Sequence, residues 1–383
     1  MKKNLFILAA AALALASCSS DETVESAALS ESNAISFRPL VSGMTRATSL
    51  VNDDLDTYGF YVTATYTTDG GSAYFEDQLY KYNNATGHVR WEPWNGSAFK
   101  VIYWPNTTEN VLDFHAYARA DAKASQLVVA NTNVASENGC PTYTVTPDAT
   151  ATDQIDFVYA TLTGQDYQDN SMTLAFEHVE SQVSIQLGNN DSGLKFTISE
   201  VALCNIAQSG IYKNRNASAA TATTMAWGNY GSNRTYLQSV NLTKDGIVEA
   251  AAAGASWILI PHTLAAPTTA GQYENDAAGA AYTGAYIRVK MKVQSTANNT
   301  IYYAGGDGDN WVYAIWPVPA SSQWNPGVHY TYTIDLAGGG YYETNQTSTN
   351  EDLDRVLQLN PITFATVNIS NWTPTGTTVG MIP

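Results

Sequence analysis

The sequence AISFRPLVSGMTRA, residues 34–47, combines a strand pattern with a loop that ends beside an arginine. Ile35, Phe37 and Val41 stand an even number of residues apart, which is the period-2 pattern of a β-strand with one face in a core. The small residues that follow could enter a protease cleft, and Arg46 is a side chain that trypsin-like proteases recognise. Cutting after Arg46 would release the strand and open a groove that another chain could fill. The alternative is an ordinary first strand with an arginine on the surface.

The composition is typical of an extracellular β-protein. Charged residues make up 14% of the 383 residues and aromatic residues 11%, with 24 tyrosines, whereas charged residues usually reach about 25%. The net charge of −17 predicts no basic patch and argues against nucleic acid or an anionic membrane surface as a partner. The hydrophobic fraction of 44% excludes a disordered chain, and the length allows two domains of ordinary size.

The first residues have the pattern of a bacterial lipoprotein signal. Lys2 and Lys3 precede an apolar run, Leu5–Ala16, that is too short to span a bilayer. The run ends in Leu-Ala-Ser followed by Cys18, which is similar to the lipobox in which the cysteine thiol receives a diacylglycerol. We therefore expect a signal peptide at 1–17 and a lipidated tether at 18–33. The alternative is a secreted protein in which Cys18 is incidental.

The rest of the chain has short alternating runs about every ten residues, separated by turn-forming residues, which predicts β-sandwich structure. Polarity rises at 188–193, where we place a boundary between an N-terminal domain, 47–190, and a C-terminal domain, 191–383. Few short helices are expected. The Ala-rich segment Glu249–Ala255 and the segment Asn350–Leu359 are candidates for helical turns.

Several segments resemble, in one order along the chain, elements of the fimbrillin (Mfa-like) family, the type V pilin precursors of Bacteroidales. These segments are Val101–Pro105, Leu112–Ala118, Asp156–Ala160, Leu174–Val183, Ile258–His262, Gly327–Leu336 and Ile369–Trp372. The resemblance implies an all-β chain with a transthyretin-like Greek-key sandwich in each of two domains. It further implies a structural adhesion subunit without enzymatic activity, cofactor or metal. Such a subunit is displayed at the outer membrane and then built into a fimbria.

The resemblance also implies maturation by an arginine-specific protease, which would cut between Arg46 and Ala47. The strand that carries Ile35, Phe37 and Val41, within a removable segment at 34–46, would then be lost. A C-terminal strand from another copy, or from a related pilin, would take its place.

The C-terminal residues offer a candidate for that donor strand. Thr375–Pro383 follows a Trp-Thr-Pro sequence and alternates Val379 with Met381. Part of Ile362–Ile369 could contribute as well. The roles of stalk, anchor and tip subunit, and the surface ligand of the fimbria, remain open from the sequence.

Other chemistry-bearing residues favour structural roles. His115 and His178 stand in apolar strand patterns, where a hydrogen-bonded core histidine is expected. Trp104 is expected in the core, whereas Trp91 and Trp94 could fill the core or stack on sugar rings. The rival function is therefore a glycan-binding surface lipoprotein that grips polysaccharide with exposed aromatic residues.

Two further features leave questions open. Cys140 and Cys204 could form a disulfide in an oxidising compartment or remain thiols. The segment Gly305–Asn310 has the spacing of a calcium loop but lacks the downstream glutamate of an EF-hand. A solvated hairpin turn is the better interpretation, and no metal site is predicted.

Overall fold

The computed structural model is an all-β protein. It describes residues 33–41, 55, 57–67, 71–85, 90–105, 111–119, 125–130, 139–167, 171–215, 224–265, 284–302, 310–318, 322–338, 341–342 and 366–371. Strands make up 63% of this part and helices 4%, and no helix reaches seven residues. The predicted fold class, all-β with few short helices, is confirmed.

Seven described strands of the N-terminal half close into a ring, with the order β1-β4-β3-β2-β5-β8-β9 and back to β1. Their bounds are β1 Phe37–Val41, β2 Phe60–Tyr66, β3 Ala73–Asn83, β4 Arg90–Pro93, β5 Leu112–Arg119, β8 Phe157–Gln165 and β9 Met172–His178. Every pair in the ring is antiparallel except β1 with β9, which is parallel. The ring encloses one hydrophobic core, to which β1 contributes.

The C-terminal half consists of two sheets that face each other. One has the order β15-β10-β19-β21, with β16 also paired to β10, and the other has the order β14-β11-β17-β18-β20. The first contains β10 Ser181–Asn189, β15 Val248–Ala252, β16 Trp257–Leu259, β19 Val328–Asp335 and β21 Thr366–Asn371. The second contains β11 Leu194–Ala207, β14 Asn233–Asp245, β17 Tyr286–Ser295, β18 Val312–Pro317 and β20 Tyr341–Tyr342.

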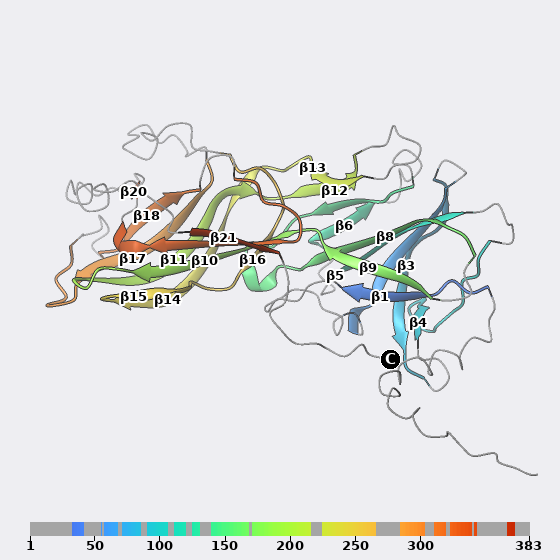
Figure 1. Ribbon diagram of the computed structural model, residues 1–383, viewed down its shortest axis with the longest axis horizontal. Coiled ribbons are helices and arrows are strands. Elements are labelled where there is room, and N and C mark those ends of the chain that lie inside the picture. The colour runs from blue at the N-terminus through green and yellow to red at the C-terminus, as the bar shows by residue number, and fades with distance from the viewer. Residues whose placement is uncertain are drawn as a thin grey trace, which may run out of the picture.

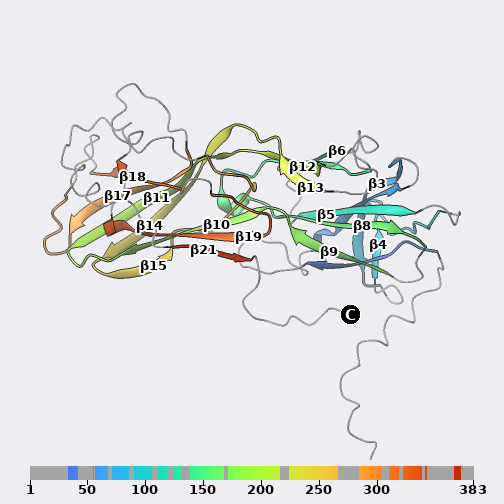
Figure 2. The same cartoon turned by 45° about the horizontal axis from the view of Figure 1, so that its top comes forward.

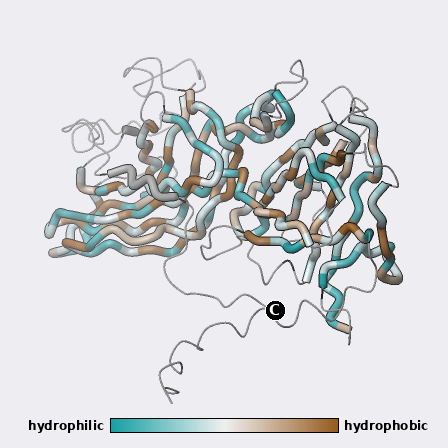
Figure 3. Tube along the Cα trace, turned by 45° about the vertical axis from the view of Figure 1, so that its right-hand side comes forward, coloured by the Kyte–Doolittle hydropathy of each residue, from teal (hydrophilic) through white to brown (hydrophobic). Residues whose placement is uncertain are grey.

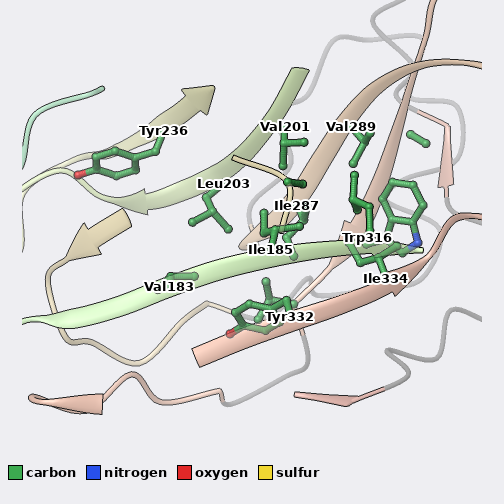
Figure 4. Packing of buried hydrophobic residues seen from close by; sticks show 14 of the residues in the cluster. Val183, Ile185, Val201, Leu203, Tyr236, Ile287, Val289, Trp316, Tyr332 and Ile334 are labelled. Carbon is green, nitrogen blue, oxygen red and sulfur yellow. The ribbon is translucent and has the colours of Figure 1, made fainter. Parts of the chain in front are cut away.

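The core of this sandwich lies between the two sheets (Figure 4). Ile185 of β10 and Tyr332 of β19 point toward Leu203 of β11 and Val289 of β17, and all four are buried. Trp316 of β18 closes one side of the same cluster. Interdigitated apolar side chains from two sheets are what the alternating sequence pattern predicts.

A fourth sheet joins the two halves of the molecule. It has the order β13-β12-β7-β6, with β6 Leu127–Ala130, β7 Thr142–Val145, β12 Gly210–Asn214 and β13 Met225–Gly228. Figures 1 and 2 show it near the middle of an elongated molecule, with β3 and β4 toward one end and β17 and β18 toward the other. Tyr143 and Tyr212 of this sheet pack with Phe157 of the ring and with Ile260, which follows β16.

The strand pairing changes from the ring to the C-terminal sheets between β9 and β10, which are separated by Val179 and Glu180. β10 pairs with β19, β15 and β16. The boundary expected between residues 190 and 191 stays a prediction, because a sheet shared by both halves does not define two separate units.

One local prediction is wrong. Residues 249–252, within the segment expected as a helical turn, belong to the strand β15, which pairs with β10. Alanines suit this site because the two backbones lie close: a Cβ built on Gly188 would be 3.0 Å from the amide nitrogen of Ala250. Elsewhere the strands alternate as expected, and Figure 3 shows hydrophobic and hydrophilic residues alternating along them in both halves.

Candidate functional site at the first strand

β1 lies between β9 and β4 and closes the N-terminal ring. It runs beside β9 over its full length, with Cα partners from Phe37–Met172 to Val41–Phe176. Its pairing with β4 consists of one antiparallel pair, Phe37 with Trp91. β1 is therefore held along one edge and paired at a single position along the other.

The residues just before β1 continue this attachment through backbone hydrogen bonds. The Ile35 amide donates to the Ile102 carbonyl at 2.7 Å, and the Trp104 amide donates to the Asn33 carbonyl at 2.8 Å. These bonds join the start of the strand to the segment that follows β4. The attachment is extended backbone pairing, so another extended segment of similar length could replace it.

Ser36 adds a side-chain contact on the opposite edge. Its carbonyl accepts a hydrogen bond of 3.0 Å from the Met172 amide. Its hydroxyl lies 2.9 Å from the hydroxyl of Ser171. The Ser36–Ser171 pair links the residues just before β1 and β9, and no local sequence pattern predicts it because the partners are 135 positions apart.

The apolar side chains of this segment fill the core of the ring. Ile35, Phe37 and Val41 are 2%, 1% and 6% exposed, which confirms the alternation expected from the sequence. The Phe37 ring meets Tyr80 and Phe114 edge-to-face, with centroids 5.0 and 5.2 Å away, a favoured aromatic geometry. At roughly 1.5–3 kcal/mol for each buried side chain, the three contribute on the order of 5–9 kcal/mol.

A shallow pocket marks the loosely paired side of the strand. It is lined by Ala34–Ser36, Arg90–Pro93 and Lys100–Ile102. Glu92 is buried there and accepts hydrogen bonds from Asn83 Nδ2 at 2.6 Å and from Arg90 Nε at 2.5 Å. The Glu92 carboxylate links β4 to β3 through Asn83 and is bonded within β4 by Arg90.

The structure brings together some of the predicted site residues and does not describe others. Ile35, Phe37 and Val41 meet in the core of the ring. The predicted lipidation, cleavage and donor positions lie outside the described residues: Cys18, Arg46, Ala47, Val379 and Met381. In the described part, no helix has the length and hydropathy needed to cross a membrane.

The histidines of interest have structural surroundings, as expected. His115 is fully buried, and its Nδ1 lies 2.6 Å from the Tyr159 hydroxyl. Burial lowers the pKa of His115 to about 4, because the charged imidazolium is poorly solvated there. His178 Nδ1 pairs with Asp156 at 2.8 Å. Among the described residues, no group of three or more His, Cys, Asp or Glu is suited to hold a metal.

The tryptophans divide between core and surface. Trp104 is buried in the ring core, as predicted. Trp91 of β4 is partly buried and packs against Phe60, with ring centroids 5.2 Å apart. Trp94 is also partly exposed and lies edge-on to Phe99 at 4.9 Å. Each of the three rings has an aromatic neighbour, and whether Trp91 or Trp94 also contacts a sugar stays a prediction.

The two described cysteines are buried thiols in different surroundings. Cys140 Sγ lies 3.6 Å from His115 Nε2. Cys204 belongs to a small cluster with Tyr286 and Ile315 on the other half of the molecule. Of the candidate calcium loop Gly305–Asn310, residues 305–309 lie outside the described residues.

Comparison with known proteins places the chain in a family. A family model described as fimbrillin-like matches residues 45–372. Solved structures of proteins proposed to act in cell adhesion are similar: one from Bacteroides uniformis has 16% identity and a TM-score of 0.40, covering 84% of this chain and 98% of its own. One from Bacteroides ovatus has 15% identity and a TM-score of 0.38, covering 83% and 97%. No curated protein matches the chain.

Proposed function

The chain belongs to the fimbrillin-like family, and on that premise we propose that it is the precursor of a structural pilin subunit that polymerises by strand exchange. The proposal assigns adhesion as the role of the fimbria. It includes no enzymatic activity, cofactor or metal. Three steps make up the mechanism: delivery to the cell surface, removal of the first strand, and insertion of a strand from another subunit.

The proposal rests on which residues form the core of the N-terminal ring. Ile35, Phe37 and Val41 supply part of that core, yet all three precede the predicted cleavage site after Arg46. The family match starts at residue 45 and leaves β1 outside, although β1 is a paired member of the ring. A domain whose core includes side chains from outside the part that matches the family is suited to exchanging that segment for another strand.

Removal of β1 would leave a groove that a soluble subunit cannot keep empty. The edge of β9 from Met172 to Phe176 would lose its partner strand, and Tyr80 and Phe114 would lose the Phe37 ring between them. Unpaired strand edges beside an apolar trough favour pairing with another chain. An incoming strand restores backbone bonds and core contacts together by β-augmentation.

The donor strand in this proposal is Thr375–Pro383, with Val379 and Met381 as the residues that enter the groove. β21, Thr366–Asn371, pairs with β19 over six positions, which favours its retention in its own subunit. The family match ends at residue 372, so the donor, like β1, lies outside the matched part. Residues 372–383 follow β21, and an extended chain of twelve residues spans at most about 40 Å.

Delivery to the surface rests on the N-terminal signal. Lipidation of Cys18 would anchor the precursor in the outer membrane until an arginine-specific protease cuts between Arg46 and Ala47. Replacing Cys18 with Ala is expected to leave the precursor unprocessed by the lipoprotein signal peptidase and absent from the cell surface. Normal surface display of the Cys18→Ala protein would contradict this step.

Mild trypsin treatment of purified precursor tests the central steps. We expect a stable product that begins at Ala47, although 17 of the 18 Lys and Arg residues lie elsewhere, and a ladder of multimers on a gel. The matched variant is Arg46→Gln, which should give neither the Ala47 product nor the ladder. A stable core that begins elsewhere would refute the assignment of the site.

A deletion separates the donor from the groove. The precursor without Thr375–Pro383 is expected to fold and to be trimmed at Arg46, but to extend no further. Mixing it with trimmed full-length protein should cap growing fibres, because its groove still accepts a donor while it supplies none. Long fibres from the deleted protein alone would place the donor strand in another segment.

A further inference from the structure

Two polar atoms in the core of the N-terminal ring have no hydrogen-bond partner among the described residues. They are Trp104 Nε1 and the Tyr80 hydroxyl. Trp104 is 7% exposed and Tyr80 is fully buried, and both belong to the core that β1 completes. Buried polar groups in folded proteins are nearly always hydrogen-bonded, because water no longer solvates them. Each of these two atoms therefore destabilises the ring of the precursor.

The residues just before β1 lie beside Trp104 but leave its indole N–H unpartnered. Ala34 and Tyr103 form an antiparallel bridge, which places Asn33 opposite Trp104 and Ile35 diagonally next to it on the same face. Asn33 is exposed, whereas Ile35 and Trp104 both belong to the ring core. The side chain of Ile35 has no polar atom, so it cannot accept a hydrogen bond from Trp104 Nε1.

The predicted donor strand has the same length as the segment that it would replace. The backbone contacts of the β1 segment extend from residue 33 to residue 41, a length of nine residues, and Thr375–Pro383 also has nine residues. When the two segments are aligned end to end in the same direction, Val379 takes the place of Phe37. Val379 and Met381 then both face the core, as the alternation of the donor requires.

A hydroxyl contact supports this direction. The alignment puts Thr378 in the place of Ser36, whose hydroxyl lies 2.9 Å from the hydroxyl of Ser171, so a hydroxyl pair with Ser171 is retained. In the opposite direction Gly380 would take the place of Ser36, and the pair would be lost. The surroundings of Ser36 therefore favour a donor that runs parallel to β9, as β1 does.

Thr377 is the donor residue that takes the place of Ile35 beside Trp104. Both side chains are branched at Cβ, but Thr377 carries a hydroxyl oxygen that can accept a hydrogen bond, and the indole N–H is a donor. We propose that Thr377 of the incoming strand accepts a hydrogen bond from Trp104 Nε1, and that this bond, which Ile35 cannot make, favours the donor over β1. The bond presupposes the proposed strand exchange and adds a chemical requirement to it, a hydroxyl at this one position of the incoming strand.

This bond gives the groove a means to distinguish the donor from β1. On apolar burial alone β1 is the better occupant, because it offers an isoleucine and a phenylalanine where the donor offers a threonine and a valine. Providing an acceptor for a buried N–H offsets part of that difference. Many extended apolar segments have a suitable shape for the groove, but a site with a buried hydrogen-bond donor discriminates against a segment that lacks the acceptor.

Peptides that compete for the groove test this bond. Full-length precursor is treated with trypsin in the presence of the peptide Thr375–Pro383, which contains no Lys or Arg and is therefore not cut. A peptide that occupies the groove should block the multimer ladder, and the concentration that halves the ladder measures its affinity. The comparison peptide is Thr377→Val, which keeps the branched shape and loses the hydroxyl.

The sign of the change between these two peptides is decisive. With the bond present, the Thr377→Val peptide should bind about 2- to 13-fold more weakly, which is the effect of one net hydrogen bond. Without the bond, the Thr377→Val peptide should bind more tightly, because a buried hydroxyl without a partner is unfavourable. The matched control is Thr375→Val, which should change the affinity little because Thr375 takes the place of the exposed Asn33.

Two variants of the full chain identify the partner of Thr377. Trp104→Phe removes the indole N–H, so the Thr377→Val peptide should no longer bind more weakly than the unmodified peptide. Tyr80→Phe removes the other unpartnered group and keeps the ring, so the difference between the peptides should persist at full size. Because both peptides are compared on the same protein, packing lost in Trp104→Phe cancels from their ratio. If Trp104→Phe does not fold, the sign measured on the unmodified protein still decides.

The outcomes separate this bond from the proposed function. Equal or tighter binding of the Thr377→Val peptide, or a difference that persists in Trp104→Phe, overturns the bond and leaves strand exchange in place. A difference that disappears in Tyr80→Phe also overturns it. If no peptide reduces a ladder that forms in its absence, the donor assignment fails and the bond fails with it. If no ladder forms without peptide, strand exchange itself is contradicted.

Discussion

The two halves of the molecule differ in where their cores come from. The buried core of the C-terminal sandwich, in the part the structure describes, runs from Ala151 to Leu336 and lies wholly within the family match. The core of the N-terminal ring includes Ile35, Phe37 and Val41, which precede that match. The core of the C-terminal sandwich is therefore formed within the part that matches the family. The core of the N-terminal ring depends on a segment that precedes the predicted cleavage site.

The same contrast is visible in strand pairing. Both halves contain one parallel pair next to the β9–β10 connection, β1 with β9 and β19 with β10. β19 pairs along both edges, with β10 over seven positions and with β21 over six. β1 has five pairs with β9 and one with β4. A strand with a single pair along its second edge is easier to exchange than a strand paired along the whole of both edges.

The largest effect is expected from replacing one buried phenylalanine by alanine in each half. Phe37→Ala should destabilise the ring of the precursor by about 3–5 kcal/mol, as large-to-small core substitutions do. Phe196→Ala should cost the C-terminal sandwich a similar amount. After trypsin, the Phe37 effect should vanish because β1 has left, while the Phe196 effect should persist. Hydrogen exchange of β5 and β11 amides measures the two halves separately.

That pair of variants also shows how the comparison could fail. If the Phe37→Ala effect on β5 protection survives trimming at full size, β1 stays in the ring after cleavage. Each half would then keep all of its core strands after cleavage, and β1 would be an ordinary strand of the fold.

A smaller difference is expected in the pH dependence of stability. Burial holds the pKa of His115 at about 4 in the folded protein, below its value of about 6.5 in an unfolded chain. The unfolded state then binds more protons as the pH falls, so the stability is fully present above pH 6.5 and is lost as the pH falls through 4. The shift corresponds to a loss of about 3 kcal/mol between pH 7 and pH 4.

Urea unfolding at pH 7 and pH 4 measures this effect. His115→Gln should flatten the pH dependence of the ring, because the amide does not titrate. The matched control is His329→Gln in the C-terminal sandwich. His329 is half-buried, burial lowers its pKa as well, and its Nε2 bonds to the Ser184 hydroxyl. An equal or larger flattening by His329→Gln would contradict the assignment to His115.

The wall of the groove should respond differently from the strand that fills it. Glu92→Ala removes the buried acceptor of Asn83 Nδ2 and Arg90 Nε, which should cost about 1–3 kcal/mol. The cost should be the same before and after trypsin, since β4 stays in place when β1 leaves. A Glu92→Ala effect that disappears on trimming would mean that β4 loses its order together with β1.

The smallest effect concerns the register contact. Ser36→Ala removes one side-chain hydrogen bond to Ser171, which should cost about 0.5–1.5 kcal/mol and speed release of the cleaved strand by roughly 2- to 13-fold. Ser184→Ala, on β10, is the control because its partner Ser256 lies in the other half. Release rates follow from the appearance of the freed peptide over time. Equal rates in both variants would show that Ser36 does not limit release.

The sequence predicted those features of the fold that depend only on neighbouring residues in the chain. The alternation of Ile35, Phe37 and Val41 predicts the buried face of β1 without knowledge of its neighbours, because a strand presents every second residue to one side. The burial of Trp104 was also predicted. The helical turn expected at Glu249–Ala255 was wrong because alanine has no side chain that opposes a strand, and the close approach of β10 decided the outcome.

What the sequence did not provide is non-local. The parallel register of β1 on β9 joins positions 135 apart, and no local pattern encodes it. Trp91 was left between core and surface, and in the structure its ring lies at the edge of the core, against Phe60.

Native mass spectrometry of the trypsin-treated precursor shows whether β1 is an exchangeable part of the ring. We expect folded species that begin at Ala47 and contain no β1 peptide, at first as monomers and later as multimers that differ by one subunit. A folded species that keeps the cleaved β1 peptide bound, and that does not multimerise, would contradict the claim.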